Sequence, residues 1–164
     1  MPDESAMHAS ARKVVDALKA KGVVGPFREF SDSTKTAADA AAALACELGA
    51  IASCLVFVLD DDPVVVIKSG AFRVDTKKFT QLVGATTMRQ ANAEEVRRAT
   101  GQPIGGVSPV NWPGPLHVYI DRSLADFAQL WAACGTPNCV FGTSYEELRR
   151  LTGATPIHLD PPGR

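Results

Sequence analysis

The residues best suited to chemistry lie in one loop, residues 101–115. It reads Gly-Gln-Pro-Ile-Gly-Gly-Val-Ser-Pro-Val-Asn-Trp-Pro-Gly-Pro, with four glycines and four prolines in fifteen residues. Proline stiffens such a loop, while glycine allows backbone conformations that other residues avoid. The adjacent Gly105 and Gly106 would let backbone N–H groups approach a ligand, which suits a carboxyl ester or a developing oxyanion. The alternative to a ligand-binding loop is a purely structural connection over the edge of a sheet.

No familiar catalytic motif accompanies this loop. The sequence has no Gly-x-Ser-x-Gly elbow, no His-Glu-x-x-His and no Walker-type loop. Pro103 also interrupts any dinucleotide-binding fingerprint. Two single residues have two interpretations each: Asp121 is a helix-entry residue or a catalytic acid, and Trp112 stacks on a base or packs at an exposed edge.

The cysteines and histidines do not have the spacing of a metal site. No Cys-x-x-Cys pair occurs, and the histidines are scattered. The residues concerned are Cys46, Cys54, Cys134, Cys139, His8, His117 and His158. We therefore expect no metal, and we expect the four thiols to be small buried hydrophobic groups of a cytoplasmic protein.

Composition and charge restrict the class of protein further. The chain has 164 residues, 46% hydrophobic and 21% charged, which is an ordinary profile for one globular domain. A net charge of −1 is far from that of a protein held to nucleic acid by charge alone. No apolar run is long enough for a membrane span, and acidic residues stand where a signal peptide would be basic. These features predict a cytoplasmic protein.

The elements that must position the loop follow from capping residues and glycine stops. Helices are predicted over residues 9–21, 36–48, 75–83, 92–101, 123–135 and 144–153. Strands are predicted at residues 27–30, 54–59, 64–67, 86–90, 116–120, 138–141 and 155–159, with a hairpin turn at residues 60–63. Because helices and strands alternate around one hairpin, the sheet should be mixed. We expect one α/β domain over residues 9–160, between flexible ends at 1–8 and 161–164.

Several segments from about residue 9 to residue 158 resemble one protein family, in order and with family-like spacing. They are residues 51–57, 69–70 with 73–75, 105–109, 119–121 with Leu124, 131–135 with Pro137, and 140–141. These segments resemble the YbaK-type proteins, free-standing relatives of the editing domain inserted in bacterial prolyl-tRNA synthetases. The resemblance implies an α/β fold whose mixed, partly barrel-like sheet is surrounded by helices. It also implies hydrolysis of an amino acid from a mischarged tRNA, without metal or organic cofactor.

The resemblance also implies partners and site residues. The partners would be the 3′-terminal end of aminoacyl-tRNA and an aminoacyl-tRNA synthetase, with no membrane, and the protein would be a monomer or homodimer. In the family, the Gly-x-x-x-Pro loop holds the aminoacyl ester through backbone groups while water, or a group of the substrate, attacks the carbonyl. Gly105, Gly106 and Pro109 would therefore be catalytic. The implied substrate-binding residues are Ser53, Lys68, Val107, Ser108, Asn111, Asp121, Gly135 and Thr136.

Position 53 departs from the family pattern. The family typically has a lysine there, just before a strand, whereas this chain has Ser53. Three explanations are open: a different amino-acid specificity, a cation from elsewhere, or loss of hydrolysis. The alternative function is therefore a catalytically weak or inactive module that binds aminoacyl-tRNA, a nucleotide or a protein partner in the same pocket.

Lys68 is a candidate for the missing cation. If the hairpin pairs Asp60 with Pro63, Lys68 lies opposite Leu55 and points to the same side as Ser53. Lys68 would then attract the 3′-terminal phosphate or steady the ester. The alternative is a solvated lysine at a strand end, because a β-bulge in the turn would direct the side chain to the other face.

Overall fold

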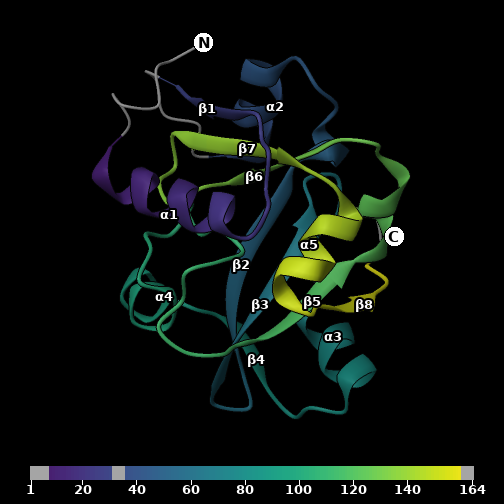
Figure 1. Cartoon of the computed structure of the whole chain (residues 1–164). Helices are drawn as coiled ribbons and strands as arrows, with labels where there is room; N and C mark the ends of the chain where they lie inside the picture. Colours follow the sequence, from purple (N-terminus) through teal and green to yellow (C-terminus); the bar gives the residue numbers. More distant parts are fainter. Residues whose placement is uncertain (1–7, 31–35, 160–164) are drawn as a thin grey trace.

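The computed structural model describes residues 8–30 and 36–159. The strands are β1 (Phe27–Glu29), β2 (Ala52–Leu59), β3 (Asp62–Ser69), β4 (Met88–Gln90), β5 (His117–Asp121), β6 (Leu130–Ala133), β7 (Cys139–Thr143) and β8 (Thr155–Ile157). The α-helices are α1 (Ala9–Ala20), α2 (Ala37–Leu44), α3 (Thr76–Val83), α4 (Ala93–Thr100) and α5 (Tyr145–Thr152). Two 3₁₀ helices, η2 (Leu48–Ala50) and η3 (Arg122–Asp126), complete the described elements. Figure 1 shows β2 and β3 side by side through the centre of the molecule, with α3 near one end and α2 near the other.

Capping residues start four helices where the sequence predicts them. Thr36 and Asn92 form capping boxes with the third residue of their helices, and the side chains of Asp75 and Ser144 accept hydrogen bonds from backbone N–H groups. A glycine in the left-handed conformation ends three of these helices: Gly84, Gly101 and Gly153. These starts and stops depend on residues within one turn of each other, so they can be predicted locally.

The strands form two sheets. One has the order β4-β2-β3-β5-β8 and the other has the order β1-β7-β6. The β2–β3 hairpin is antiparallel, whereas β5 pairs in parallel with both β3 and β8, so the predicted mixed α/β sheet is confirmed. Within the described residues the larger sheet stays open rather than closing as a barrel, and a bridge between Ile51 and Trp131 links it to the smaller sheet.

Both faces of the larger sheet are covered. One face packs against α3 through a cluster that includes Val64, Val66, Phe79 and Tyr119. The other face belongs to the main core, which α1, α4, α5 and the smaller sheet complete. The main-core residues of β2 and β3 are Ala52, Cys54, Val56, Val65 and Ile67. Alternate residues of each strand therefore serve different clusters, as the two-residue period of a strand requires.

Two predicted helices are wrong in extent or type. α2 ends at Leu44, because Ala45 adopts a left-handed conformation with φ of 53°. The predicted helix over residues 123–135 is instead η3 followed by β6. Asp121 caps η3 by accepting a hydrogen bond from the Ser123 N–H, and β6 then pairs with β7. Pairing with a strand downstream in the chain overrides the local helix signal there.

The predicted flexible ends fall almost entirely outside the described residues, which leave out 1–7, 31–35 and 160–164. His8 is described, and its side chain accepts a hydrogen bond from the N–H of Ser10 at the start of α1. The boundaries 9–160 stay a prediction. None of the helices in the described ranges is long and apolar enough to cross a membrane.

Candidate functional site

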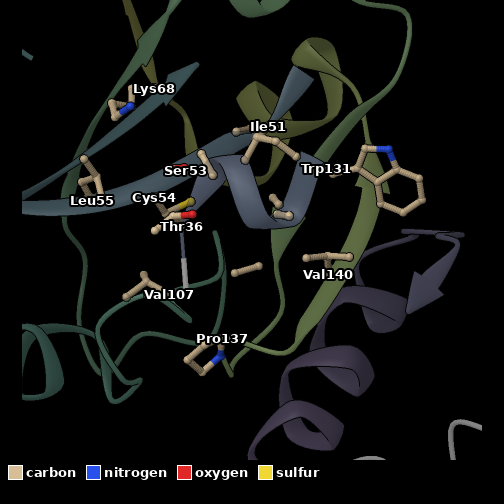
Figure 2. A pocket seen from close by; sticks show the side chains of 16 residues that line it. Thr36, Ile51, Ser53, Cys54, Leu55, Lys68, Val107, Trp131, Pro137 and Val140 are labelled. Carbon is tan, nitrogen blue, oxygen red and sulfur yellow. The ribbon is translucent and has the colours of Figure 1, made fainter. Parts of the chain in front are cut away.

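A cavity of about 230 Å³ lies between the first half of β2, the start of α2, the strands β6 and β7, and the loop around Gly105. β4 pairs with β2 only at Phe57–Leu59, so the earlier part of β2 is open to the cavity at this edge. Most lining residues are apolar, including Ala40, Ile51, Trp131 and Val140. Figure 2 shows that the cavity is built from segments far apart in the sequence.

The loop after α4 is held by a buried glutamine. The Gln102 side chain donates from Nε2 to the Val110 carbonyl over 2.9 Å and accepts from the Ser108 N–H over 2.7 Å. The Trp112 indole N–H donates to the Ser108 carbonyl over 3.0 Å. Sequence reasoning missed Gln102. A glutamine among glycines and prolines could have been noticed as a brace, because its amide needs partners when it is buried.

Two amides of the loop have no hydrogen-bond acceptor within the described residues. The Gly106 N–H donates to the Pro103 carbonyl over 2.9 Å, and the Ser108 N–H is taken by Gln102. The N–H groups of Gly105 and Val107 have no hydrogen-bond acceptor in the described part of the chain, and both residues line the cavity. The Gly106 N–H is therefore already used within the loop, whereas those of its two neighbours are not.

Gly106 serves instead as a point of close backbone contact. A Cβ atom there would lie 2.6 Å from the carbonyl carbon of Thr136 and 2.7 Å from its Cα. The Gly106 carbonyl accepts from the N–H of Gly135 over 3.0 Å. A Cβ on Gly135 would in turn lie 2.7 Å from Cγ2 of Val14 in α1. The loop thus rests on the β6–β7 connection, which rests on α1.

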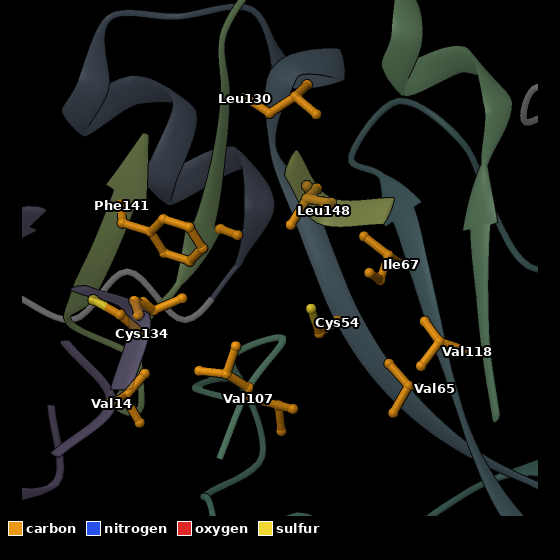
Figure 3. Packing of buried hydrophobic residues seen from close by; sticks show 14 of the residues in the cluster. Val14, Cys54, Val65, Ile67, Val107, Val118, Leu130, Cys134, Phe141 and Leu148 are labelled. Atoms are coloured by element: carbon orange, nitrogen blue, oxygen red, sulfur yellow. The ribbon is translucent and has the colours of Figure 1, made fainter. Parts of the chain in front are cut away.

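Two valines anchor the loop in the main core. Val107 and Val110 are 3% and 4% exposed and pack in the main cluster. Figure 3 shows Val107 among the core side chains, with Val14 and Cys134 on the same side of the cluster. The loop position is therefore fixed by packing as well as by hydrogen bonds, which is the preorganisation that an oxyanion site needs.

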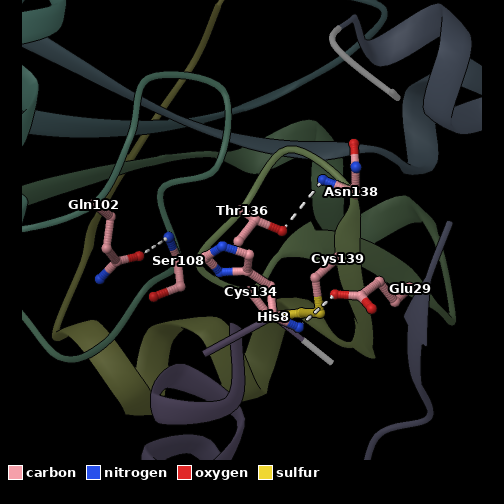
Figure 4. Close-up of a disulfide and its surroundings, with 8 residues drawn as sticks. All are labelled: His8, Glu29, Gln102, Ser108, Cys134, Thr136, Asn138 and Cys139. Atoms are coloured by element: carbon pink, nitrogen blue, oxygen red, sulfur yellow. Dashed lines mark hydrogen bonds between the residues drawn. A yellow bond between two sulfur atoms is a disulfide. The ribbon is translucent and has the colours of Figure 1, made fainter. Parts of the chain in front are cut away.

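A disulfide closes the β6–β7 connection. Cys134 and Cys139 are bonded, and the Cys134 N–H also donates to the Cys139 carbonyl over 2.9 Å. Figure 4 shows the bond beneath the turn that carries Thr136 and Asn138. The expectation of four separate thiols is wrong, and Cys46 and Cys54 are the free ones. The pairing was hidden because the segment before Cys134 was interpreted as helix, whereas a strand brings the two cysteines together.

The remaining thiol at the cavity is not a nucleophile at neutral pH. Cys54 lines the cavity, and burial raises the pKa of its thiol to about 12, so the sulfur keeps its proton. The described lining residues include no histidine that could act as a base. The described residues also contain no group of three or more His, Cys, Asp or Glu side chains that could hold a metal ion.

The hairpin places Lys68 directly opposite Ser53. The prediction that Lys68 lies opposite Leu55 is wrong by two residues, because the two-residue turn is Asp60–Asp61, one residue earlier than predicted, and pairs Leu59 with Asp62. The expected shared face holds, since a two-residue shift keeps the side of the sheet. Both Ser53 and Lys68 line the cavity.

The Lys68 ammonium is half-buried and held by backbone oxygens. It donates to the Phe72 carbonyl over 2.9 Å and to the Ser69 carbonyl over 3.2 Å. Burial lowers the pKa of Lys68, the Asp121 carboxylate opposes this effect, and the Arg73 charge adds to it. The alternative of a solvated strand-end lysine is therefore wrong, because the ammonium is partly buried and bonded to backbone carbonyls.

The cavity includes four residues of the predicted set: Ser53, Lys68, Gly105 and Val107. The other predicted residues are not among its lining residues; they are Gly106, Ser108, Pro109, Asn111, Asp121, Gly135 and Thr136. Asp121 is 1% exposed and accepts from the N–H groups of Ser69 and Ser123. These contacts agree with its interpretation as a helix-entry residue. Asn111 is exposed, with φ of 66°.

A family comparison agrees with this architecture. The model of the aminoacyl-tRNA editing domain family matches residues 31–151. The chain belongs to the aminoacyl-tRNA editing domain family. The resemblance to YbaK-type and prolyl-tRNA synthetase-associated editing domains is therefore confirmed.

Relatives of this editing domain occur alone and within larger enzymes. It is 34% identical to the uncharacterized protein YwhH of Bacillus subtilis (strain 168), over 76% of this chain and 79% of that protein. It is 31% identical to the proline–tRNA ligase of Streptococcus mutans over 62% of this chain, and the match spans only 15% of the ligase. A solved structure of a proposed trans-editing enzyme for prolyl-tRNA synthetase has a TM-score of 0.87 and 42% identity, covering 94% of this chain and 99% of that one. The structure of hypothetical protein APE2540 has a TM-score of 0.80 and 30% identity, covering 90% and 98%.

Proposed function

We propose that this editing domain hydrolyses the ester between tRNA and a wrongly attached amino acid, acting as a separate protein on the 3′-terminal end of aminoacyl-tRNA. One observation carries the proposal: the amide groups of Gly105 and Val107 are available at a cavity in a chain of the editing family. The likeness to a proposed trans-editing enzyme along nearly its full length supports action in trans. According to this proposal, the protein acts on the products of an aminoacyl-tRNA synthetase and does so in the cytoplasm.

The chemistry is ester hydrolysis without a protein nucleophile. The carbonyl oxygen of the ester accepts hydrogen bonds from the Gly105 and Val107 N–H groups, and these bonds strengthen as the oxygen becomes negative. A water oxygen attacks the carbonyl carbon, the bond to the ribose oxygen breaks, and that oxygen leaves with a proton from the water. A preorganised donor of this kind lowers the activation barrier by about 3–4 kcal/mol. Because the Cys54 thiol keeps its proton, an acyl-enzyme on that residue is disfavoured.

The cavity suits a small amino acid. Its volume of about 230 Å³ lies below the range of roughly 300–1,000 Å³ typical of small-molecule sites. The apolar side chains of Ala40, Ile51 and Val140 would surround the amino-acid side chain, while the terminal nucleotide stays at the mouth.

The test is the loss of ester from a panel of mischarged tRNAs. Small amino acids should be released faster than in buffer, large aromatic ones should not, and the Gly106→Ala variant should be slow on every substrate. The alternative function is a module that only binds aminoacyl-tRNA, and Ser53 at the family's lysine position favours it. No acceleration for any small amino acid, together with binding of an uncleavable amide analogue, would establish that alternative.

A further inference from the structure

Lys68 is the charged side chain in the cavity wall, among lining residues that are otherwise apolar or uncharged in the described part of the chain. We infer that its ammonium binds the phosphodiester before the terminal nucleotide of the tRNA and so positions the ester, an inference that rests on the proposed function. Lys68 is thus a positioning residue, because the ester itself is held elsewhere.

Its place in the sheet separates Lys68 from the ester site. Lys68 lies on β3, whereas the loop with Gly105 and Val107 lies at the opposite edge of β2. Figure 2 shows Lys68 and Val107 on opposite sides of the β2 ribbon, with Ser53 between them. Neighbouring strands are about 4.8 Å apart, so an ammonium on β3 lies one strand spacing farther from the loop than one on β2. In the substrate, the anionic group nearest the ester is the phosphodiester on the 5′ side of the terminal ribose.

The surroundings of Lys68 prepare it for an anion. Two of its three N–H donors are used by the Ser69 and Phe72 carbonyls, so one remains for a ligand within the described residues. The buried Asp121 carboxylate supports the positive charge, and Arg73 adds to the positive potential on the same side. A half-desolvated ammonium binds a phosphate oxygen more strongly than a fully solvated one does. Ser53, directly opposite, is small and leaves this approach open.

The decisive experiment compares two substrates that share the ester but differ in the phosphate. Aminoacyl-tRNA has the phosphodiester, and aminoacyl-adenosine lacks it. Lys68→Ala should raise KM for aminoacyl-tRNA about tenfold with kcat nearly unchanged, and should alter hydrolysis of aminoacyl-adenosine less than twofold. Lys68→Arg should retain most of the parent KM, because a guanidinium also binds phosphate. Lys77→Ala, which removes an exposed lysine from α3, is the matched control and should behave like the parent.

Three outcomes would overturn the inference. Equal slowing of both substrates would mean that Lys68 acts on the ester or only braces residues 69–72, and a lowered Tm would identify the brace. Parent-like kinetics of Lys68→Ala would remove the residue from the site. If the parent hydrolyses nothing, the proposed function fails. Lys68 is then tested by binding of two uncleavable analogues, amide-linked aminoacyl-tRNA and amide-linked aminoacyl-adenosine. An equal loss of affinity for both analogues in Lys68→Ala would refute the inference.

Discussion

A methyl group added at Gly106 tests whether the loop position controls catalysis. Gly106 does not have a positive φ, so alanine is compatible with its backbone conformation. The new Cβ would lie 2.6 Å from the carbonyl carbon of Thr136, whereas non-bonded carbon atoms prefer about 3.5–4.0 Å. Because the Cβ would meet backbone atoms of Thr136 and Pro137 rather than a flexible side chain, the loop with Gly106 and the β6–β7 connection must separate by about 1 Å.

The size of the effect follows from that displacement. The neighbouring amides of Gly105 and Val107 would move with the loop, and a misplacement of about 1 Å costs roughly 100-fold in rate. We therefore expect kcat/KM of Gly106→Ala to fall about 100-fold, or about 2.7 kcal/mol. Overpacking of this kind costs about 1–3 kcal/mol of stability, which lowers Tm by about 2–12 °C for a chain of this length.

The assay is release of amino acid from the best substrate of the panel, with circular dichroism to establish folding. Gly114→Ala is the matched control, because a Cβ at Gly114 meets no atom within 4 Å. It should keep parent kinetics and Tm. A folded Gly106→Ala variant with kcat/KM within twofold of the parent would refute the idea that this loop positions the ester.

Further predictions concern the disulfide, acid stability and metal. The double variant Cys134→Ser/Cys139→Ser should lose about 2 kcal/mol and about 4–8 °C in Tm by calorimetry, whereas Cys46→Ala should lose much less; equal Tm values would contradict a structural role. The Arg89 guanidinium holds the pKa of Glu95 at about 2, below its ordinary value of 4.5. Because the folded pKa is the lower one, this contribution is complete above pH 4.5 and is lost as pH falls toward 2, so Glu95→Gln should lower Tm at pH 7 and flatten its acid dependence. A chelator should leave kcat/KM and Tm unchanged, given the cysteine and histidine spacing, and a chelator-sensitive rate would contradict this.

The parts of the fold that sequence reasoning predicted are those set by neighbouring residues. The box of Asn92 and Glu95 starts α4, and Asp75 and Gly84 bound α3. The apolar runs of the central hairpin also identify their strands, since they are short, rich in β-branched residues and separated by a polar turn. The loop with Gly105 could be selected as a candidate site from its composition alone.

The parts that could not be predicted depend on distant partners. Which amides of the loop stay available depends on the Gln102 side chain, which accepts from the Ser108 N–H, and on the Pro103 carbonyl, which accepts from the Gly106 N–H. The position of the loop depends on a more distant contact, from the Gly135 N–H to the Gly106 carbonyl, which no local pattern reveals. The strand β6 is preceded by residues 123–126, which imitate a capping box, and only its pairing with β7 establishes it as a strand. The disulfide could not be predicted for the same reason, because Cys134 and Cys139 come within bonding distance only once β6 and β7 are paired.

The hairpin turn links local chemistry to the position of the cation in the site. Residues 60–62 are three consecutive aspartates, so the sequence allows more than one register. Asp60 and Asp61 both adopt positive φ, of 48° and 71°, as a two-residue turn between antiparallel strands requires. The N–H groups of Thr86 and Thr87 donate to the Asp60 carboxylate over 2.8 and 2.7 Å, which lowers the pKa of Asp60 and stabilises this turn.

This turn determines on which face Lys68 lies. With Asp60 and Asp61 as the turn residues, Lys68 pairs with Ser53, on the face that reaches the cavity. A slip of one residue would pair Lys68 with Cys54 and turn the lysine to the opposite face, toward the main core. Burying an unpaired ammonium there is costly, so the core itself disfavours the slipped register. The same apolar packing that stabilises the sheet therefore keeps the cation at the cavity.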